Sequence, residues 1–236
     1  MVATPAGAPA PDVTVRPAEG KTTGVVLVLP GGKAASRSPA RRHHLSALRM
    51  VPFARELHRA VGRQGMAVWT LRYRYRGWNG TEASPVLDAR WALEEIRRRH
   101  GEVPVVLVGH SMGGRTALRV ADDPAVHAVV ALAPWLPPDE PVAPVGDRRV
   151  LIMHGTADRW TDPHGSLTFA RRARAISADL RRIEVHGVGH TMLRRAALWH
   201  GLTTYFVQES VAVKSTLASG ANVPLHAARA EVRLLV

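Results

Sequence analysis

Residues 103–114 of the chain read VPVVLVGHSMGG. The apolar run Val103–Val108 is typical of a strand that is buried on both faces, and helical spacing begins again at Gly113. The intervening Gly-His-Ser-Met-Gly predicts a sharp strand-to-helix turn, in which larger residues than glycine would collide with the strand or the helix. We expect this turn to present the Ser111 hydroxyl at the carboxyl end of a sheet and to leave the Met112 amide free at a helix start.

Apolar strand patterns alternate with helical patterns on both sides of this turn. The expected strands are 24–29, 66–71, 103–108, 128–133, 150–153 and 181–186, with a short edge strand at 13–16 as a further candidate. The expected helices are 46–63, 85–100, 113–121, 167–175 and 192–207. This alternation predicts an α/β fold with a mostly parallel, doubly wound central sheet and helices on both faces.

The length of 236 residues is sufficient for one large α/β domain. We divide the chain into an N-terminal arm at 1–20, an α/β domain at 21–208 and a C-terminal tail at 209–236. The tail lacks the hydrophobic periodicity of the rest, so we expect it to be flexible, with a short extra strand or a partner-binding segment as alternatives.

Composition excludes several kinds of chemistry and partner. The chain has no cysteine, which excludes disulfides, thiolate metal sites and cysteine nucleophiles. The net charge of +13 is spread along the chain without a nucleic-acid motif, so we expect a solvated basic surface and no nucleic-acid partner. No apolar run is long enough for a membrane span, and Met1–Pro11 lacks the features of a signal peptide. We therefore expect a cytoplasmic protein, either a monomer or a homodimer.

A serine hydroxyl is a weak nucleophile at neutral pH and needs a base, which in turn needs an orienting acid. Asp158 follows the strand at 150–153, and His190 follows the next strand in a glycine-rich loop. Parallel strands bring both loops to the edge of the sheet that carries Ser111, so the three side chains can converge. Other residues remain open for these roles: Asp162, Asp139 and Glu140 for the acid, and His186 and His200 for the base.

His154 is more easily assigned to supporting the acid loop than to the chemistry itself. The histidines and carboxylates form no compact metal-ligand motif, so we expect neither a metal nor another cofactor.

Over about residues 21–208 the chain resembles the α/β-hydrolase family. The resemblance rests on the turn around Ser111, on His-Gly-x-x-Asp at His154–Asp158 and on Gly-x-Gly-His at Gly187–His190. It implies a catalytic triad of Ser111, Asp158 and His190.

The resemblance also implies an oxyanion hole, formed by the Met112 amide and by the loop that follows the first buried strand. Many relatives have His-Gly where this chain has Pro30-Gly31, which leaves open whether Gly32 or Lys33 supplies the second amide.

The implied activity is hydrolysis of a small ester, lactone or thioester. Acyl transfer, cyclisation, perhydrolysis or ligand binding without catalysis are the alternatives. The segment 134–149 is short and holds five prolines, so it cannot form the helical cap that many relatives have. Trp135 and Trp160 either wall the substrate pocket or are ordinary core and loop aromatics. The loop Lys33–Arg42 is basic, and is either solvated or able to steer an anionic substrate.

Overall fold

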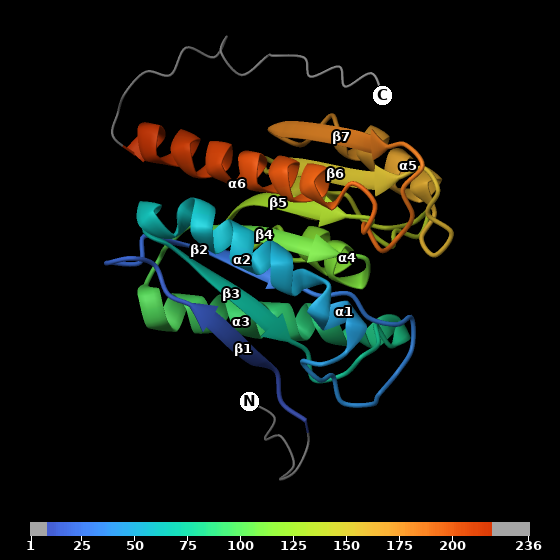
Figure 1. Cartoon of the computed structure of the whole chain (residues 1–236), viewed down its shortest axis with the longest axis horizontal. Helices are drawn as coiled ribbons and strands as arrows, with labels where there is room; N and C mark the ends of the chain where they lie inside the picture. The colour runs from blue at the N-terminus through green and yellow to red at the C-terminus, as the bar shows by residue number, and fades with distance from the viewer. Residues whose placement is uncertain (1–8, 219–236) are drawn as a thin grey trace.

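A computed structural model describes residues 9–218 of the chain. Its centre is a 7-stranded sheet in the order β1-β3-β2-β4-β5-β6-β7 (Figure 1). The strands are β1 Asp12–Arg16, β2 Gly24–Leu29, β3 Met66–Arg72, β4 Val105–His110, β5 Val126–Leu132, β6 Arg149–Gly155 and β7 Asp179–Val185. Every neighbouring pair is parallel except β1 and β3, which are antiparallel. The α/β fold with a mostly parallel sheet is therefore confirmed, and the candidate edge strand is present as β1.

Helices cover both faces of the sheet, as expected. They are α1 Leu45–Leu48, α2 Met50–Val61, α3 Ser84–His100, α4 Met112–Arg119, α5 Pro163–Ala173 and α6 Ala196–Ala218. Short 3-10 helices lie at Gly62–Gln64, Gly80–Glu82 and Ala143–Val145. Figure 1 shows α2 and α6 side by side on one face. The apolar side chains of α3, α4 and α5 pack on the other face, so the sheet lies between two hydrophobic layers.

The register of the central strands determines which loops lie next to each other at the carboxyl end of the sheet. All residues of β2 and β4 are buried, because helices cover both sides of these strands. Leu29 of β2 lies beside Gly109 of β4 in the parallel register. The loops that follow these two strands therefore leave the sheet next to each other.

Several helix boundaries differ from the sequence prediction, and two of the differences have a structural explanation. The helix expected at 46–63 is divided at Arg49 into α1 and α2. Pro52 explains the break, because it has no N–H to donate to Leu48 and its ring would collide with that carbonyl group.

The expected end of the last helix near Val207 is wrong, because α6 continues to Ala218. Charged contacts hold the additional part against the sheet. Arg181 lies 2.8 Å from Glu209, and Arg149 donates to the buried Ser210 hydroxyl at 3.1 Å. Residues 219–236 of the predicted tail lie outside the described residues, and the division of the chain at 20 and 208 stays a prediction.

The chain between β5 and β6 forms no cap over the carboxyl end of the sheet. Its single regular element is the 3-10 helix Ala143–Val145. Within residues 9–218, no helix is both long and apolar enough to cross a membrane.

Candidate active site

The turn after β4 has the strained geometry that the sequence predicts. Ser111 has φ 56° and ψ −119°, a positive φ that is unusual for a residue other than glycine. A side chain at Gly109 would overlap the Gly113 carbonyl oxygen, and one at Gly113 would overlap the Leu29 carbonyl oxygen. The Ser111 amide donates to the carbonyl oxygen of Leu132 at 2.9 Å, which ties the turn to β5.

Asp158 and His190 meet above the ends of β6 and β7, and both are buried. His190 Nδ1 lies 2.8 Å from Asp158 Oδ2. The other carboxylate oxygen, Oδ1, accepts from the amides of Trp160 at 2.8 Å and Thr161 at 3.0 Å. Backbone amides two and three residues further along the chain therefore hold one carboxylate oxygen, and the other oxygen is directed at the imidazole.

The environment of Asp158 favours its ionised form. Burial by itself would raise the pKa of Asp158, but hydrogen bonds from His154, His190, Thr161 and Trp160 outweigh it and hold the pKa well below the usual range. His154 Nε2 lies 3.3 Å from Asp158 Oδ2, which agrees with its expected supporting position. An ionised carboxylate stabilises the Nδ1–H tautomer of His190 and leaves Nε2 free to accept a proton.

His110, next to Ser111, is a site residue that the sequence analysis did not identify. It is buried, and its Nε2 atom lies 3.0 Å from the His190 carbonyl oxygen. Burial, followed by the proximity of His190, lowers the pKa of His110 to about 3, so the ring is neutral at ordinary pH. A neutral ring that donates from Nε2 connects the serine turn to the histidine loop. The position of His110 directly before Ser111 in Gly-x-Ser-x-Gly is the sequence feature that could have identified it.

The structure places the alternative acids in other environments. Asp162 caps α5 by accepting from the His164 amide at 2.8 Å. Glu140 is buried between Arg115, at 2.6 Å, and Arg119. Asp139 lines a different cavity, with Arg119 and Trp78.

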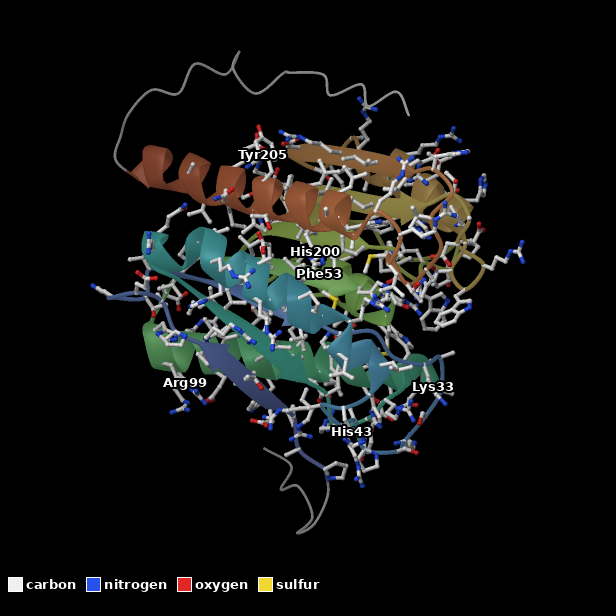
Figure 2. The ribbon with its side chains drawn as sticks, in the orientation of Figure 1. Lys33, His43, Phe53, Arg99, His200 and Tyr205 are labelled. Carbon is white, nitrogen blue, oxygen red and sulfur yellow. The ribbon has the colours of Figure 1, made fainter. Side chains whose placement is uncertain are left out.

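The alternative bases also lie apart from Asp158. Figure 2 shows His200 beside Phe53 where α6 meets α2, and the two ring centroids are 4.2 Å apart. His186 is exposed just after β7. Among the described histidines, His190 is the one that shares a pocket with Ser111 and contacts a buried carboxylate.

Ser111 and His190 line a pocket of about 370 Å³. Trp135, Trp160 and Arg49 also line it. The Trp160 side chain is 75% exposed, and its ring centroid lies 5.2 Å from that of His190. Among the described contacts, no hydrogen bond joins the Ser111 hydroxyl to His190. Such hydrogen bonds are often long or poorly aligned in the absence of substrate.

The loop after β2 faces the start of α4. Gly32 packs so closely on Met112 that a side chain at Gly32 would overlap the Met112 thioether. The Lys33 amide donates to the Arg76 carbonyl oxygen at 2.8 Å and is therefore occupied. The Gly32 amide has no partner among the described backbone hydrogen bonds, and Met112, as the first residue of α4, has no intrahelical acceptor. Gly32 and Met112, the residues that carry these two amides, line the pocket together with Ser111.

Residues 9–218 contain no group of three or more histidine, aspartate or glutamate side chains that could hold a metal ion. The pocket instead offers a serine and a buried imidazole, and this imidazole contacts the ionised carboxylate of Asp158. Serine hydrolases use this combination of groups.

Comparison with protein-family models identifies the family. Residues 24–178 match the model of the alpha/beta hydrolase fold family. The chain belongs to this family.

Solved structures share the fold at low sequence identity. An alpha-beta serine hydrolase homologue from Coxiella burnetii superposes with a TM-score of 0.61 at 17% identity, covering 83% of this chain and 90% of the other. Est1E from Butyrivibrio proteoclasticus, with ferulic acid bound, gives 0.64 at 12% identity, covering 86% and 96%. A serine hydrolase without a lid from Xanthomonas campestris gives 0.59 at 19% identity, covering 84% and 88%. No protein with a curated description matches the chain by sequence.

Proposed function

We propose that the chain is a serine hydrolase of the carboxylesterase type, acting on a small ester, lactone or thioester. The observation that carries the proposal is the 2.8 Å contact of His190 Nδ1 with the ionised Asp158, since His190 lines the same pocket as Ser111. A buried acid–base pair and a serine in a strained backbone conformation both lower the stability of the fold, which favours a functional role for them. Hydrolysis through an acyl-enzyme gives each of the three residues a role.

In the proposed reaction, Ser111 Oγ attacks the substrate carbonyl carbon while His190 Nε2 takes the hydroxyl proton. The carbonyl oxygen becomes an oxyanion. Collapse of this intermediate expels the alcohol or thiol, which receives the proton from His190, and leaves an acyl group on Ser111. A water molecule, deprotonated by His190, then attacks the acyl carbon, and the carboxylic acid leaves as Ser111 recovers its proton.

The amides of Met112 and Gly32 are the proposed oxyanion donors. The occupied Lys33 amide supports Gly32 as the second donor. Loss of one such donor costs roughly 2.7–4 kcal/mol of transition-state stabilisation in a measured serine hydrolase.

The proposed substrate is small because the pocket has no cap above it. Trp135 and Trp160 are the side walls that we assign to the acyl or alcohol group. Trp135 is held in place, since its ring lies 6.1 Å from Trp78 and Arg115 stacks on it at 4.7 Å. Trp160 is exposed and can adapt to the substrate.

A fluorophosphonate tests the nucleophile directly, because it forms a covalent bond with an activated serine. We expect the adduct at Ser111, located by peptide mass spectrometry, and no adduct in Ser111→Ala. Ser46→Ala is the matched control, since Ser46 lines the same pocket, and it should label like the wild type. Labelling of another serine, or none in folded protein, would contradict the proposal. Product analysis with water, alcohols and peroxide as acceptors then separates hydrolysis from acyl transfer and perhydrolysis.

A further inference from the structure

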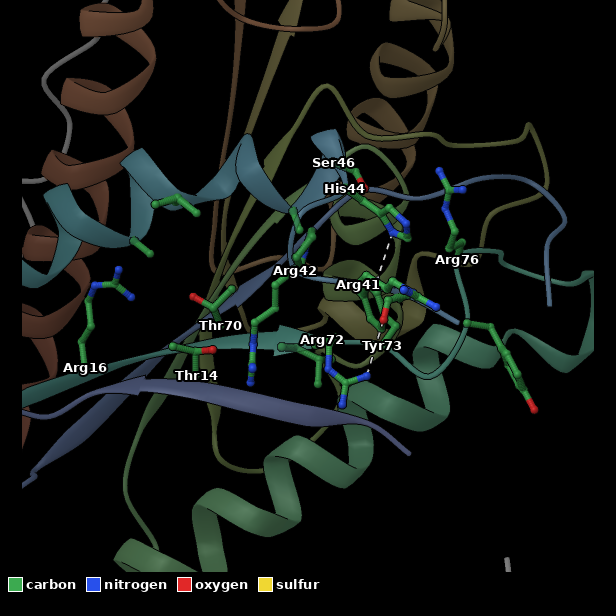
Figure 3. A pocket seen from close by; sticks show the side chains of 18 residues that line it. Thr14, Arg16, Arg41, Arg42, His44, Ser46, Thr70, Arg72, Tyr73 and Arg76 are labelled. Carbon is green, nitrogen blue, oxygen red and sulfur yellow. Dashed lines mark hydrogen bonds between the residues drawn. The ribbon is translucent and has the colours of Figure 1, made fainter. Parts of the chain in front are cut away.

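A second cavity, of about 190 Å³, lies beside the catalytic pocket. It opens between the edge strand β1 and its neighbour β3 on one side and α1 and α2 on the other (Figure 3). The two cavities share Gly31 and Ser46, but Ser111 and His190 line only the catalytic one. The second cavity is therefore adjacent to the catalytic site and separate from it.

Arginine side chains surround this second cavity. Figure 3 shows them arriving from β1, from the loop before α1, from β3 and from the chain after β3: Arg16, Arg41, Arg42, Arg72 and Arg76. Asp12 pairs with Arg42 and, at 3.6 Å, with Arg72. Within residues 9–218, the other three arginines form no ion pair. The cavity therefore has an excess of positive charge that the described part of the protein does not neutralise.

The histidine at the rim experiences this charge. The pKa of His44 is lowered, first by burial and then by electrostatic interaction with its neighbours, of which Arg76 contributes most. A neutral His44 can use Nδ1 as an acceptor, and it lies 3.1 Å from the Arg41 amide. This contact fixes the basic loop at the mouth of the cavity.

The second cavity also has polar and apolar surfaces that an organic molecule could contact. Thr14 and Thr70 face each other across the β1–β3 pair, and the buried Thr70 hydroxyl has no hydrogen-bond partner among the described residues. Ala47, Val51 and Ala54 form an apolar wall on α1 and α2. The volume is several times the roughly 30 Å³ that a water molecule occupies in the liquid.

We propose that this cavity is a binding site for a small organic oxyanion, a carboxylate or phosphate monoester on a short apolar chain. Guanidinium groups donate paired hydrogen bonds to the oxygens of either head group. The Thr70 hydroxyl supplies a further donor, and the chain lies against the alanine and valine side chains of α1 and α2. An anion bound here relieves the repulsion among the arginines.

Hexanoate, hexyl phosphate and hexan-1-ol are suitable probes, titrated at low salt by ligand-observed NMR. We expect both anions to bind and the alcohol to bind at least tenfold more weakly. The difference between hexanoate and hexyl phosphate identifies the preferred head group. Added salt should weaken the binding of the anions, because their attraction to arginine is screened.

The double variant Arg16→Gln/Arg76→Gln should raise the dissociation constant of the preferred anion at least fivefold. Arg171→Gln, which removes an exposed charge on α5, is the matched control and should leave it unchanged. Circular dichroism verifies the fold of each variant. Arg49→Gln and Ser111→Ala should also bind normally, because both residues line only the catalytic pocket. Two results would overturn the proposal. One is that hexan-1-ol binds as tightly as the anions. The other is that anion binding is lost in Arg49→Gln but kept in Arg16→Gln/Arg76→Gln.

Discussion

The hydroxyl of Thr161 lies 2.8 Å from Asp158 Oδ2, the same oxygen that His190 contacts. The Thr161 hydroxyl is also 3.1 Å from His190 Nδ1, and its amide donates to Asp158 Oδ1. One residue therefore contacts both members of the acid–base pair.

We expect Thr161→Val to lower kcat by about tenfold, because a hydrogen bond to a charged group contributes roughly 1.5–3 kcal/mol. Thr161→Ser should restore most of the loss, and an unaffected kcat in Thr161→Val would show that the hydroxyl is dispensable.

Asp158 and Asp162 provide a matched pair for testing the acid. Asp158→Asn should reduce kcat by about 10⁴-fold, because the amide no longer favours the required tautomer of His190. Asp162→Asn should leave kcat near the wild-type value, since asparagine also caps a helix well. Steady-state kinetics on one ester measures both variants. The reverse ranking would assign the acid to Asp162.

His110 should make the protein sensitive to acid. Its pKa is about 3 when folded and near 6.5 when unfolded, so between these values only the unfolded state takes up the proton. The free energy of unfolding then falls as pH falls through this window. The advantage of the wild type over His110→Gln should shrink by about 2–3 kcal/mol between pH 7 and pH 4.5.

Urea unfolding at several pH values measures this change. His186→Gln is the control, because His186 is exposed, and it should have the pH dependence of the wild type. Parallel curves for wild type and His110→Gln would contradict the assignment of a neutral His110.

Glu140 should be important for stability rather than for chemistry. Its carboxylate is buried between Arg115 and Arg119, so Glu140→Gln leaves buried positive charge without a partner. We expect a loss of about 3–5 kcal/mol in the free energy of unfolding. Glu184→Gln removes a pair with Arg182 in which the carboxylate is exposed, and it should cost about 1 kcal/mol or less. Chemical denaturation of both variants makes the comparison, and equal losses would mean that burial is not the cause.

The open pocket predicts a preference for short acyl chains. Without a cap, only the acyl carbons nearest the carbonyl are removed from water, and each further CH₂ left exposed forfeits roughly 0.8 kcal/mol of binding. The values of kcat/KM for p-nitrophenyl esters, from acetate to palmitate, should reach a maximum between acetate and hexanoate. The ester concentrations should be kept below those at which the long-chain esters form micelles. A continued rise to long chains would indicate an apolar groove elsewhere on the protein.

The strand and helix order could be predicted because it depends on local periodicity, which is strong in the buried strands β2 and β4. Parallel strands that end at one edge also predict that the loops of Asp158 and His190 lie close together. The choice of these two residues over the other acids and histidines depended on the family resemblance. The second cavity could not, because its arginines come from segments far apart in the sequence, and no local pattern indicates that they meet. The end of α6 was missed for a similar reason: Glu209, just beyond the expected end, pairs with Arg149 and Arg181, which are distant in the sequence.

Gly113, in the first turn of α4, makes a tight contact with the Leu29 carbonyl group at the end of β2. This contact also limits which substitutions the chain can accept. The two segments that carry the proposed oxyanion donors touch backbone to backbone, so little reorganisation is needed when negative charge develops on a substrate. The same contact leaves no space for a larger residue at the glycine, and neither segment can be remodelled without displacing the other. Changes of substrate preference are therefore accessible mainly through the side chains at the rim, where Trp160 is exposed and free to be replaced.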